Sequence, residues 1–153
     1  MSDPRRDDTK NYVKGKLVEL QGLTSELSDA CVKHNEQMNY FRDELGTFSD
    51  APLNQKKGIF QSIEAACSVT FLPLCQRIHN LISQCRQIGG DLKTAVEIHL
   101  VQKDKDKYNK YRNLLLKQDK IVAEFMSQEP KIYEAEQYLQ RMVSDLKQSV
   151  PAS

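Results

Sequence analysis

The fold of this chain is decided by a stretch that contains FLPLCQRIHNLISQC (residues 71–85) and, further on, QKDKDKYNKYRNLLLKQDK (residues 102–120). Apolar residues recur through residues 53–125 at steps of three and four, the spacing of one face of an α-helix. Pro73 removes one backbone donor from this pattern, so we expect the helix to kink there and continue. At about 1.5 Å per residue, such a helix would extend roughly 110 Å. A helix of that length suits an extended binding surface better than a pocket.

Gly89 and Gly90 are the main point at which this stretch could divide. Two glycines followed by Asp91 are typical of a helix end and restart, which would give an up-and-down four-helix bundle. The apolar spacing keeps its phase across both glycines, however, and this favours a continuous or gently bent helix. We therefore predict an all-α fold, an elongated antiparallel bundle of long kinked helices, with the four-helix bundle as the alternative.

The remaining elements follow from the same spacing. We predict a polar, disordered leader at residues 1–8 and a single helical domain at residues 9–149, followed by a tail at 150–153. The first helix is expected at residues 9–46. Its apolar stripe consists of Val13, Leu17, Leu20, Thr24, Leu27, Cys31, His34, Met38, Phe41 and Leu45. Thr24 and His34 are interpreted as tolerated polar positions of the bundle.

Two turns are predicted. The first is TFSDAP (residues 47–52), with Ser49 and Asp50 as capping candidates and Pro52 in the first helical turn. The second is SQEP (residues 127–130), which would leave a short last helix at residues 131–148.

A second stripe runs through the central stretch and into the last helix. It consists of Ile59, Phe60, Ile63, Cys67, Thr70, Leu74, Ile78, Leu81, Cys85, Ile88, Leu92, Ala95, Ile98, Val101, Tyr108, Tyr111, Leu115, Val122 and Phe125, then Ile132, Ala135, Leu139, Met142, Val143 and Leu146. From both stripes we predict contact positions between helices, or between two chains, at Leu17, Leu20, Leu27, Met38, Phe41, Leu74, Ile78, Leu81 and Ile88.

Composition limits the function classes. The 153 residues carry a net charge of +1, which gives no overall preference for nucleic acid. The longest apolar run, near residues 69–74, is too short to cross a bilayer, and the polar N-terminus does not resemble a signal peptide. The four cysteines lack a CxxC spacing and have apolar neighbours, as expected of reduced thiols in a cytosolic protein.

A local excess of basic residues is the main candidate for binding. It consists of Lys103, Lys105, Lys107, Lys110, Arg112, Lys117 and Lys120, against three acidic residues. The stretch is either a solvated helix face or a surface for anionic membrane. RNA is disfavoured, because Tyr108 and Tyr111 fall on the apolar side of the helix and leave no aromatic residues among the basic ones.

No catalytic constellation, metal site or cofactor site is expected. Cys31 with His34 and Cys75 with His79 have spacings at which two helices could offer zinc ligands. Neither pair shows the spacing of structural zinc sites, so we interpret them as packed thiols and partly exposed imidazoles. The sequence contains no phosphate-binding loop or nucleophile motif, and we predict that the protein is not an enzyme.

The order of these features resembles the BAR domain family. The resemblance covers about residues 10–148 and rests on FLPL (residues 71–74) within a long helix, the charged segment QKDKDKYNKYRNLLLK, and the helix KIYEAEQYLQRM after a short turn. The nearest types are the GRAF/oligophrenin and Arf-GAP-associated BAR domains. The predicted helix at residues 131–148 is about half as long as the family's third helix, which would fit a fragment or a shortened form.

The resemblance implies a curved antiparallel dimer in which basic residues of the concave side and tips hold anionic membranes. It would place Lys103, Lys105, Lys107, Lys110 and Arg112 in the distal half of the second helix, with Lys117 and Lys120 near the tip turn at residues 127–130. The expected function is thus a non-catalytic, dimeric, cytoplasmic scaffold that senses or supports membrane curvature. The alternative is a helical adaptor or complex subunit whose apolar stripes bind partner proteins.

Overall fold

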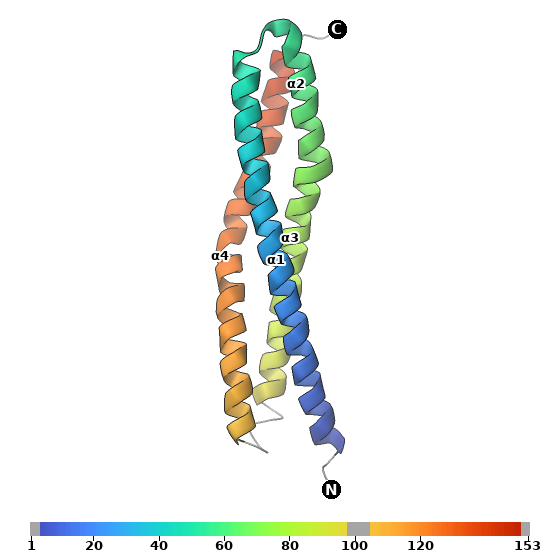
Figure 1. Cartoon of the computed structure of the whole chain (residues 1–153), viewed down its shortest axis with the longest axis vertical. Coiled ribbons are helices and arrows are strands. Elements are labelled where there is room, and N and C mark those ends of the chain that lie inside the picture. Colours follow the sequence, from blue (N-terminus) through green and yellow to red (C-terminus); the bar gives the residue numbers. More distant parts are fainter. Residues whose placement is uncertain (1–3, 98–104, 151–153) are drawn as a thin grey trace. The chain divides into compact units, whose positions relative to one another are not determined.

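The computed structural model describes residues 4–97 and 105–150, with side chains for residues 10–97, 106 and 108–150. In these residues the chain forms α1 (Pro4–Asp50), α2 (Leu53–Ala65), the π-helical segment η1 (Ala66–Phe71), α3 (Leu72–Ala95) and α4 (Lys105–Ser149) (Figure 1). No strand occurs in the described part of the chain. The predicted all-α class is therefore confirmed.

The helices form two compact units. The first unit comprises Met1–Ser28 and Asn80–Ser127, and the second comprises Asp29–His79 and Gln128–Ser153. Each unit thus combines one segment of α1, one segment of the helical run Leu53–Ala95, and one segment of α4. Each is a small helical bundle with an apolar core, because three amphipathic segments can bury their apolar faces against one another.

Both cores are built mainly from the two predicted stripes, with the further buried residues Ala30, Phe48, Phe71, Cys75, Ile82 and Val96, which were not predicted. In the first unit the buried apolar residues are Val13, Leu17, Leu20, Leu27, Leu81, Ile82, Cys85, Ile88, Leu92, Ala95, Val96, Tyr111, Leu115 and Val122. In the second unit they are Ala30, Phe41, Phe48, Phe60, Ile63, Cys67, Phe71, Cys75, Ile78, Ile132, Leu139 and Met142. At the centre of the second core, Phe41 and Phe71 pack edge to face at a centroid distance of 5.5 Å, a favourable aromatic arrangement.

The stripe of α1 is confirmed, but the ends of the helix differ from the prediction. α1 begins at Pro4, before the expected start at Thr9, and continues to Asp50. The turn is therefore shorter than residues 47–52, and neither Ser49 nor Asp50 is the N-cap of α2. Pro52 itself is the N-cap of α2, without a side-chain hydrogen bond.

The chain remains helical through Pro73, and the irregularity lies immediately before it. The N–H of Leu72 donates to the carbonyl oxygen of Cys67, five residues back, which closes the wide turn of a π-helix. This wide turn gives room to the proline ring, which in a regular α-helix clashes with the carbonyl four residues earlier. The extra residue also shifts the buried face by one position. Phe71 is buried where Thr70 was predicted, and Thr70 is exposed.

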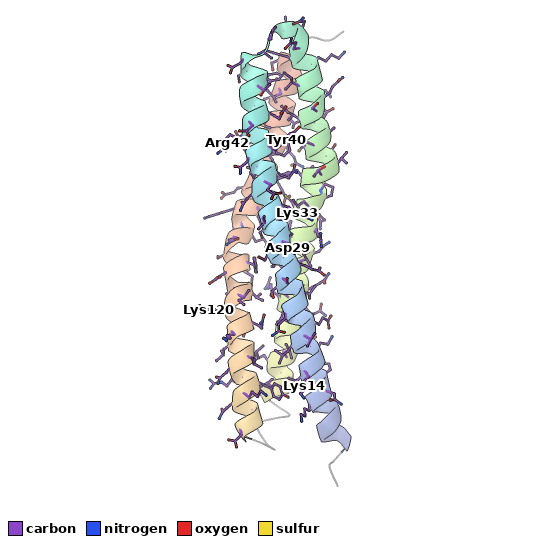
Figure 2. All side chains as sticks on the ribbon, viewed as in Figure 1. Lys14, Asp29, Lys33, Tyr40, Arg42 and Lys120 are labelled. Carbon is purple, nitrogen blue, oxygen red and sulfur yellow. The ribbon has the colours of Figure 1, made fainter. Side chains whose placement is uncertain are left out.

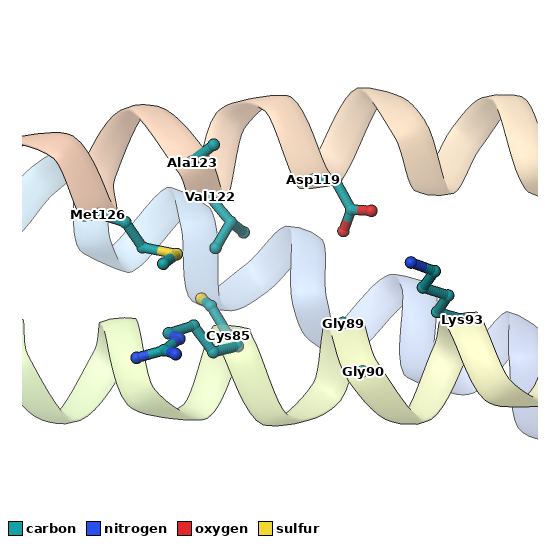
Figure 3. Close-up of a pocket in the computed structure, with 9 residues that line it drawn as sticks. Cys85, Gly89, Gly90, Lys93, Asp119, Val122, Ala123 and Met126 are labelled. Atoms are coloured by element: carbon teal, nitrogen blue, oxygen red, sulfur yellow. The ribbon is translucent and has the colours of Figure 1, made fainter.

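Gly89 and Gly90 lie inside α3, so the four-helix alternative with a turn at these glycines is wrong. A single helix over residues 53–125 is also wrong, because α3 ends at Ala95 and α4 begins at Lys105. Facing residues on the two helices run in opposite order. As the chain advances from Cys85 to Gly89 on α3, the facing residues on α4 retreat from Met126 to Asp119 (Figure 3). The predicted positions Ile98 and Val101 lie outside the described residues.

α4 continues through the predicted turn at residues 127–130, with Pro130 in its interior. The separate short helix at residues 131–148 is therefore wrong, although its apolar face is correct. Ile132, Leu139 and Met142 are buried on that face. Beside the proline, the Ser127 hydroxyl donates to the carbonyl oxygen of Glu124 at 2.6 Å, a local bond that a helix accommodates. α4 has 45 residues, close to the 47 of α1. The expectation that the third helix has about half the family's length is therefore wrong.

Replacing Gly90 by alanine tests the helical assignment of the glycine pair. A Cβ at this position meets no atom within 4 Å, and alanine in a helix interior is favoured over glycine. We expect Gly90→Ala to raise the free energy of unfolding by about 0.5–1 kcal/mol, measured by urea denaturation followed by circular dichroism. Gly46→Ala in α1 is the matched control, because its Cβ is equally free of contacts. Destabilisation by Gly90→Ala alone would contradict the assignment.

Candidate functional site

The basic stretch predicted for membrane binding lies at the start of α4, in the first unit. Lys110, Arg112, Lys117 and Lys120 are exposed, and Lys120 is labelled in Figure 2. No ion pair of these four occurs among the described residues, so their charges face solvent. The side chains of Lys105 and Lys107, and all of Lys103, lie outside the described residues. The stretch belongs to the third long helix of the chain, which corrects its expected place in the distal half of the second helix.

Two apolar side chains among these basic residues were not singled out from the sequence. Leu116 is 53% exposed and Ile121 is 38% exposed. Leu116 lies one helical turn after Arg112 and one before Lys120, so all three share one side of α4. Their helical spacing could have identified them, because both residues are out of phase with the buried positions Tyr111, Leu115 and Val122.

A shallow groove of about 260 Å³ lies beside the glycine pair in the first unit (Figure 3). Its lining includes Cys85, Val122 and Met126, and Lys93 and Asp119 lie at one end. Burial raises the pKa of the Asp119 carboxyl, while the charge of Lys93 acts in the opposite direction. The Asp119 carboxylate lies over Gly89: an ideal Cβ at Gly89 would be 3.5 Å from Asp119 Oδ1, an ordinary van der Waals contact.

The predicted contact positions between helices or chains pack against the chain's own helices. Leu17, Leu20, Leu27, Phe41, Ile78, Leu81 and Ile88 are buried, and Met38 and Leu74 are partly buried. Most of their apolar surface is therefore buried within each unit.

A polar cluster occupies the second unit, and sequence reasoning missed it. The side chain of His79 is 9% exposed and lies between two glutamates of α4, whose side chains are each 22% exposed. His79 Nδ1 is 2.9 Å from Glu129 Oε2, and His79 Nε2 is 2.5 Å from Glu136 Oε1. The ring of Tyr133 stacks on the imidazole at a centroid distance of 3.8 Å. We call these four residues the His79 cluster.

The sequence contained part of this signal. Glu129, Tyr133 and Glu136 follow the helical spacing of four and three, but the predicted turn at residues 127–130 separated Glu129 from the others. Once α4 is continuous, the three side chains share one face.

Cys75 and His34 border the cluster. Burial, followed by the charge and hydrogen bond of Glu136, raises the pKa of the Cys75 thiol to about 12. This thiol therefore stays protonated and unreactive in the folded protein. The two Cys/His pairs considered from the sequence form no metal centre, since the described residues contain no group of three or more such ligands arranged to hold an ion.

His34 lies in the core of the second unit, 8% exposed, with its ring 5.3 Å from that of Phe71. Its Nε2 is buried and has no hydrogen-bond partner in the described part of the chain. Burial lowers the pKa of His34; the charge of Glu136 partly opposes this, and His79 adds to it. His34 is therefore a neutral core imidazole, in keeping with its interpretation as a tolerated polar position.

One described helical run, Leu53–Ala95, is long and apolar enough by length and composition to cross a membrane. From the sequence we expected no such run. The core helix of a soluble protein meets the same criteria. In this chain the run supplies Phe71, Ile78 and Ile88 to the two cores.

No family model, curated protein or solved structure matches this chain. The function is therefore inferred from the arrangement of the chain's own residues.

The lowered pKa of His34 predicts a pH dependence of stability. Because the unfolded chain takes up the proton more readily, stability is lost as the pH falls below about 6.5 toward the folded pKa. We expect the free energy of unfolding of the wild type relative to that of His34→Leu, measured by urea denaturation from pH 7.5 to 5.5, to fall with a slope of at most about 1.4 kcal/mol per pH unit, because the contribution of His79 is common to both chains. His34→Leu should remove this component, and an unchanged slope in that variant would contradict the assignment.

Proposed function

We propose that this protein is a non-catalytic, peripheral membrane-binding scaffold that holds anionic lipid through the first half of α4. The observation that carries the proposal is the exposed group Lys110, Arg112, Lys117 and Lys120 surrounding the exposed side chains of Leu116 and Ile121. Basic groups attract anionic headgroups, and apolar side chains between them enter the interface. We call these six residues the α4 basic surface.

The charge distribution supports an anionic partner for the first unit. In the sequence of that unit, 14 basic residues stand against 11 acidic ones, whereas the second unit has 8 basic and 10 acidic residues. The near-neutral net charge of the chain thus combines a basic unit with an acidic one. An anionic surface would attract the first unit and weakly repel the second.

The expected affinity of one chain is modest. Four basic groups near an anionic bilayer contribute about 4 kcal/mol, and two partly exposed apolar side chains add on the order of 2 kcal/mol. Together these correspond to a dissociation constant of roughly tens of micromolar. Two linked copies of the surface would bind much more tightly, because the second contact is intramolecular.

We include a homodimer in the proposal, because it would supply the tighter binding of two linked surfaces and because the resemblance to BAR domains implies the same assembly. Helix lengths of 47 residues for α1, 43 for the run Leu53–Ala95 and 45 for α4 agree with the three long helices that the resemblance implies. We therefore include in the proposal the sensing or support of membrane curvature and a cytoplasmic, peripheral membrane location.

Vesicle binding with charge-reversed variants tests the proposal. We expect the chain to cosediment with phosphatidylserine vesicles and to be released as salt rises, since screening shortens to about 8 Å at physiological ionic strength. Lys117→Glu with Lys120→Glu should weaken binding at least about tenfold. Leu116→Ser should weaken it with an unchanged salt dependence, because it removes only the apolar contribution.

The matched control is Lys131→Glu with Lys147→Glu, which makes the same change in net charge on exposed residues of α4 in the second unit. This control should bind vesicles like the wild type. Binding that is insensitive to salt, or an equal loss in both double variants, would refute the α4 basic surface as the lipid site.

The second candidate is a helical adaptor that binds partner proteins. Four large aliphatic residues favour it, since each is more than half exposed outside the α4 basic surface: Val18, Val32, Leu53 and Val69. If the wild-type chain fails to bind anionic vesicles even at low salt, this candidate takes the place of the first.

A further inference from the structure

The two ring nitrogens of His79 both face carboxylate oxygens. Nδ1 lies 2.9 Å from Glu129 and Nε2 lies 2.5 Å from Glu136. A neutral imidazole carries one N–H, whereas the imidazolium carries two, and an ionised carboxylate can only accept. Both hydrogen bonds therefore form only if the three groups together hold one proton more than a neutral imidazole and two carboxylates.

The other titratable neighbours of His79 do not supply a substitute donor. From α1 the neighbour is His34, which burial keeps neutral. From α3 it is Cys75, whose hydrogen bond is to Glu136. From α4, Tyr133 lies flat against the imidazole ring with an interplanar angle of 13°, so it covers the ring and does not bond to its edge.

We propose that the His79 cluster is a proton-operated clamp that holds α3 against α4 within the second unit. With the proton present, His79 donates to Glu129 and Glu136, which lie two turns apart on α4. When hydroxide removes the proton, one N–H bond breaks, its electron pair stays on the ring nitrogen, and the hydroxide becomes water. A lone pair then faces a partly buried carboxylate, and the contact changes from attractive to repulsive.

The backbone next to the clamp is suited to local opening. Pro130 follows Glu129 directly and has no N–H to give to the preceding turn of α4. On the other side, η1 ends four residues before Cys75, and its wide turn replaces the regular α-helical bonding. Loss of the proton thus acts where both helices have weakened backbone bonding, and local opening is governed by such low-stability segments.

Cys75 reports the opening because it is fully buried and bonded to Glu136. Its alkylation by iodoacetamide requires that α3 and α4 separate locally. Cys85, equally buried but in the first unit, is the internal reference. The ratio of the two rates, read by mass spectrometry of the intact wild-type chain, cancels the intrinsic rise of thiol reactivity with pH.

We expect this ratio to rise about tenfold between pH 6 and pH 9, as the loss of one hydrogen bond to a charged group implies. In Glu129→Gln the ratio should change less than about twofold, because the amide N–H donates to the neutral ring nitrogen and no extra proton is needed. Glu134→Gln, an exposed neighbour on α4 with the same charge change, should behave like the wild type.

A ratio that stays constant with pH in the wild-type chain, or that rises equally in Glu129→Gln, would overturn the proposal. A double-mutant cycle between His79→Phe and Glu129→Ala, which removes the carboxylate without introducing a new donor, provides an independent measurement if both variants fold. We expect a coupling of about tenfold in the unfolding equilibrium at pH 6 that falls below about threefold at pH 9. None of these measurements involves vesicles, so they are independent of the proposed lipid binding.

Discussion

Burial of the α1 stripe is the interaction on which the rest of the structure depends. In proteins, tertiary packing of an amphipathic face supplies most of the stability of a helix. In α1, Val13, Leu20 and Leu27 are fully buried. They follow one another at intervals of about two helical turns. Each removes apolar surface from water against the α3 and α4 segments of its unit. α1 thus contributes to both cores, and neither unit closes without it.

The polar groups in these cores differ in how much their burial costs in folding free energy. Thr24 satisfies its hydroxyl within α1 by donating to the carbonyl oxygen of Gln21, so it costs little. His34 leaves Nε2 without a hydrogen-bond partner in the described part of the chain, which costs folding free energy because that atom has lost its hydration. His79 is satisfied, but at the expense of two partly buried carboxylates. A buried ion pair seldom adds net stability over an apolar replacement. We therefore interpret the His79 cluster as a group that controls or specifies the packing of α3 against α4.

The two proposed sites use charge in opposite ways. On the α4 basic surface the charges remain in water, where they attract a partner at a distance that salt limits. In the His79 cluster the charges lie in a less polar environment, where they act at contact distance and depend on the presence of a proton. The first is a binding surface in the first unit, and the second governs helix packing in the second unit. Each can be removed by substitution without touching the other.

The sequence by itself determined the class of the fold and the buried faces of its helices. Steps of three and four locate the core positions of α1 from Val13 to Leu45, because burial of an amphipathic face depends only on local spacing. The same phase across Gly89 and Gly90 predicted that the helix continues there. The exposed charges of Lys110 to Lys120 were also predictable, because they fall outside the apolar face.

Only the tertiary structure decided where the chain turns and which polar groups meet. Pro130 was taken as part of a turn, although packing of Ile132 and Leu139 holds α4 together across it. The π-helical turn before Pro73 moved the core from Thr70 to Phe71, a shift that no regular period contains. His79 and Glu136 are 57 residues apart, and their contact exists because α3 and α4 pack side by side. A spacing pattern describes one helix at a time, whereas a hydrogen bond between helices depends on the register of two.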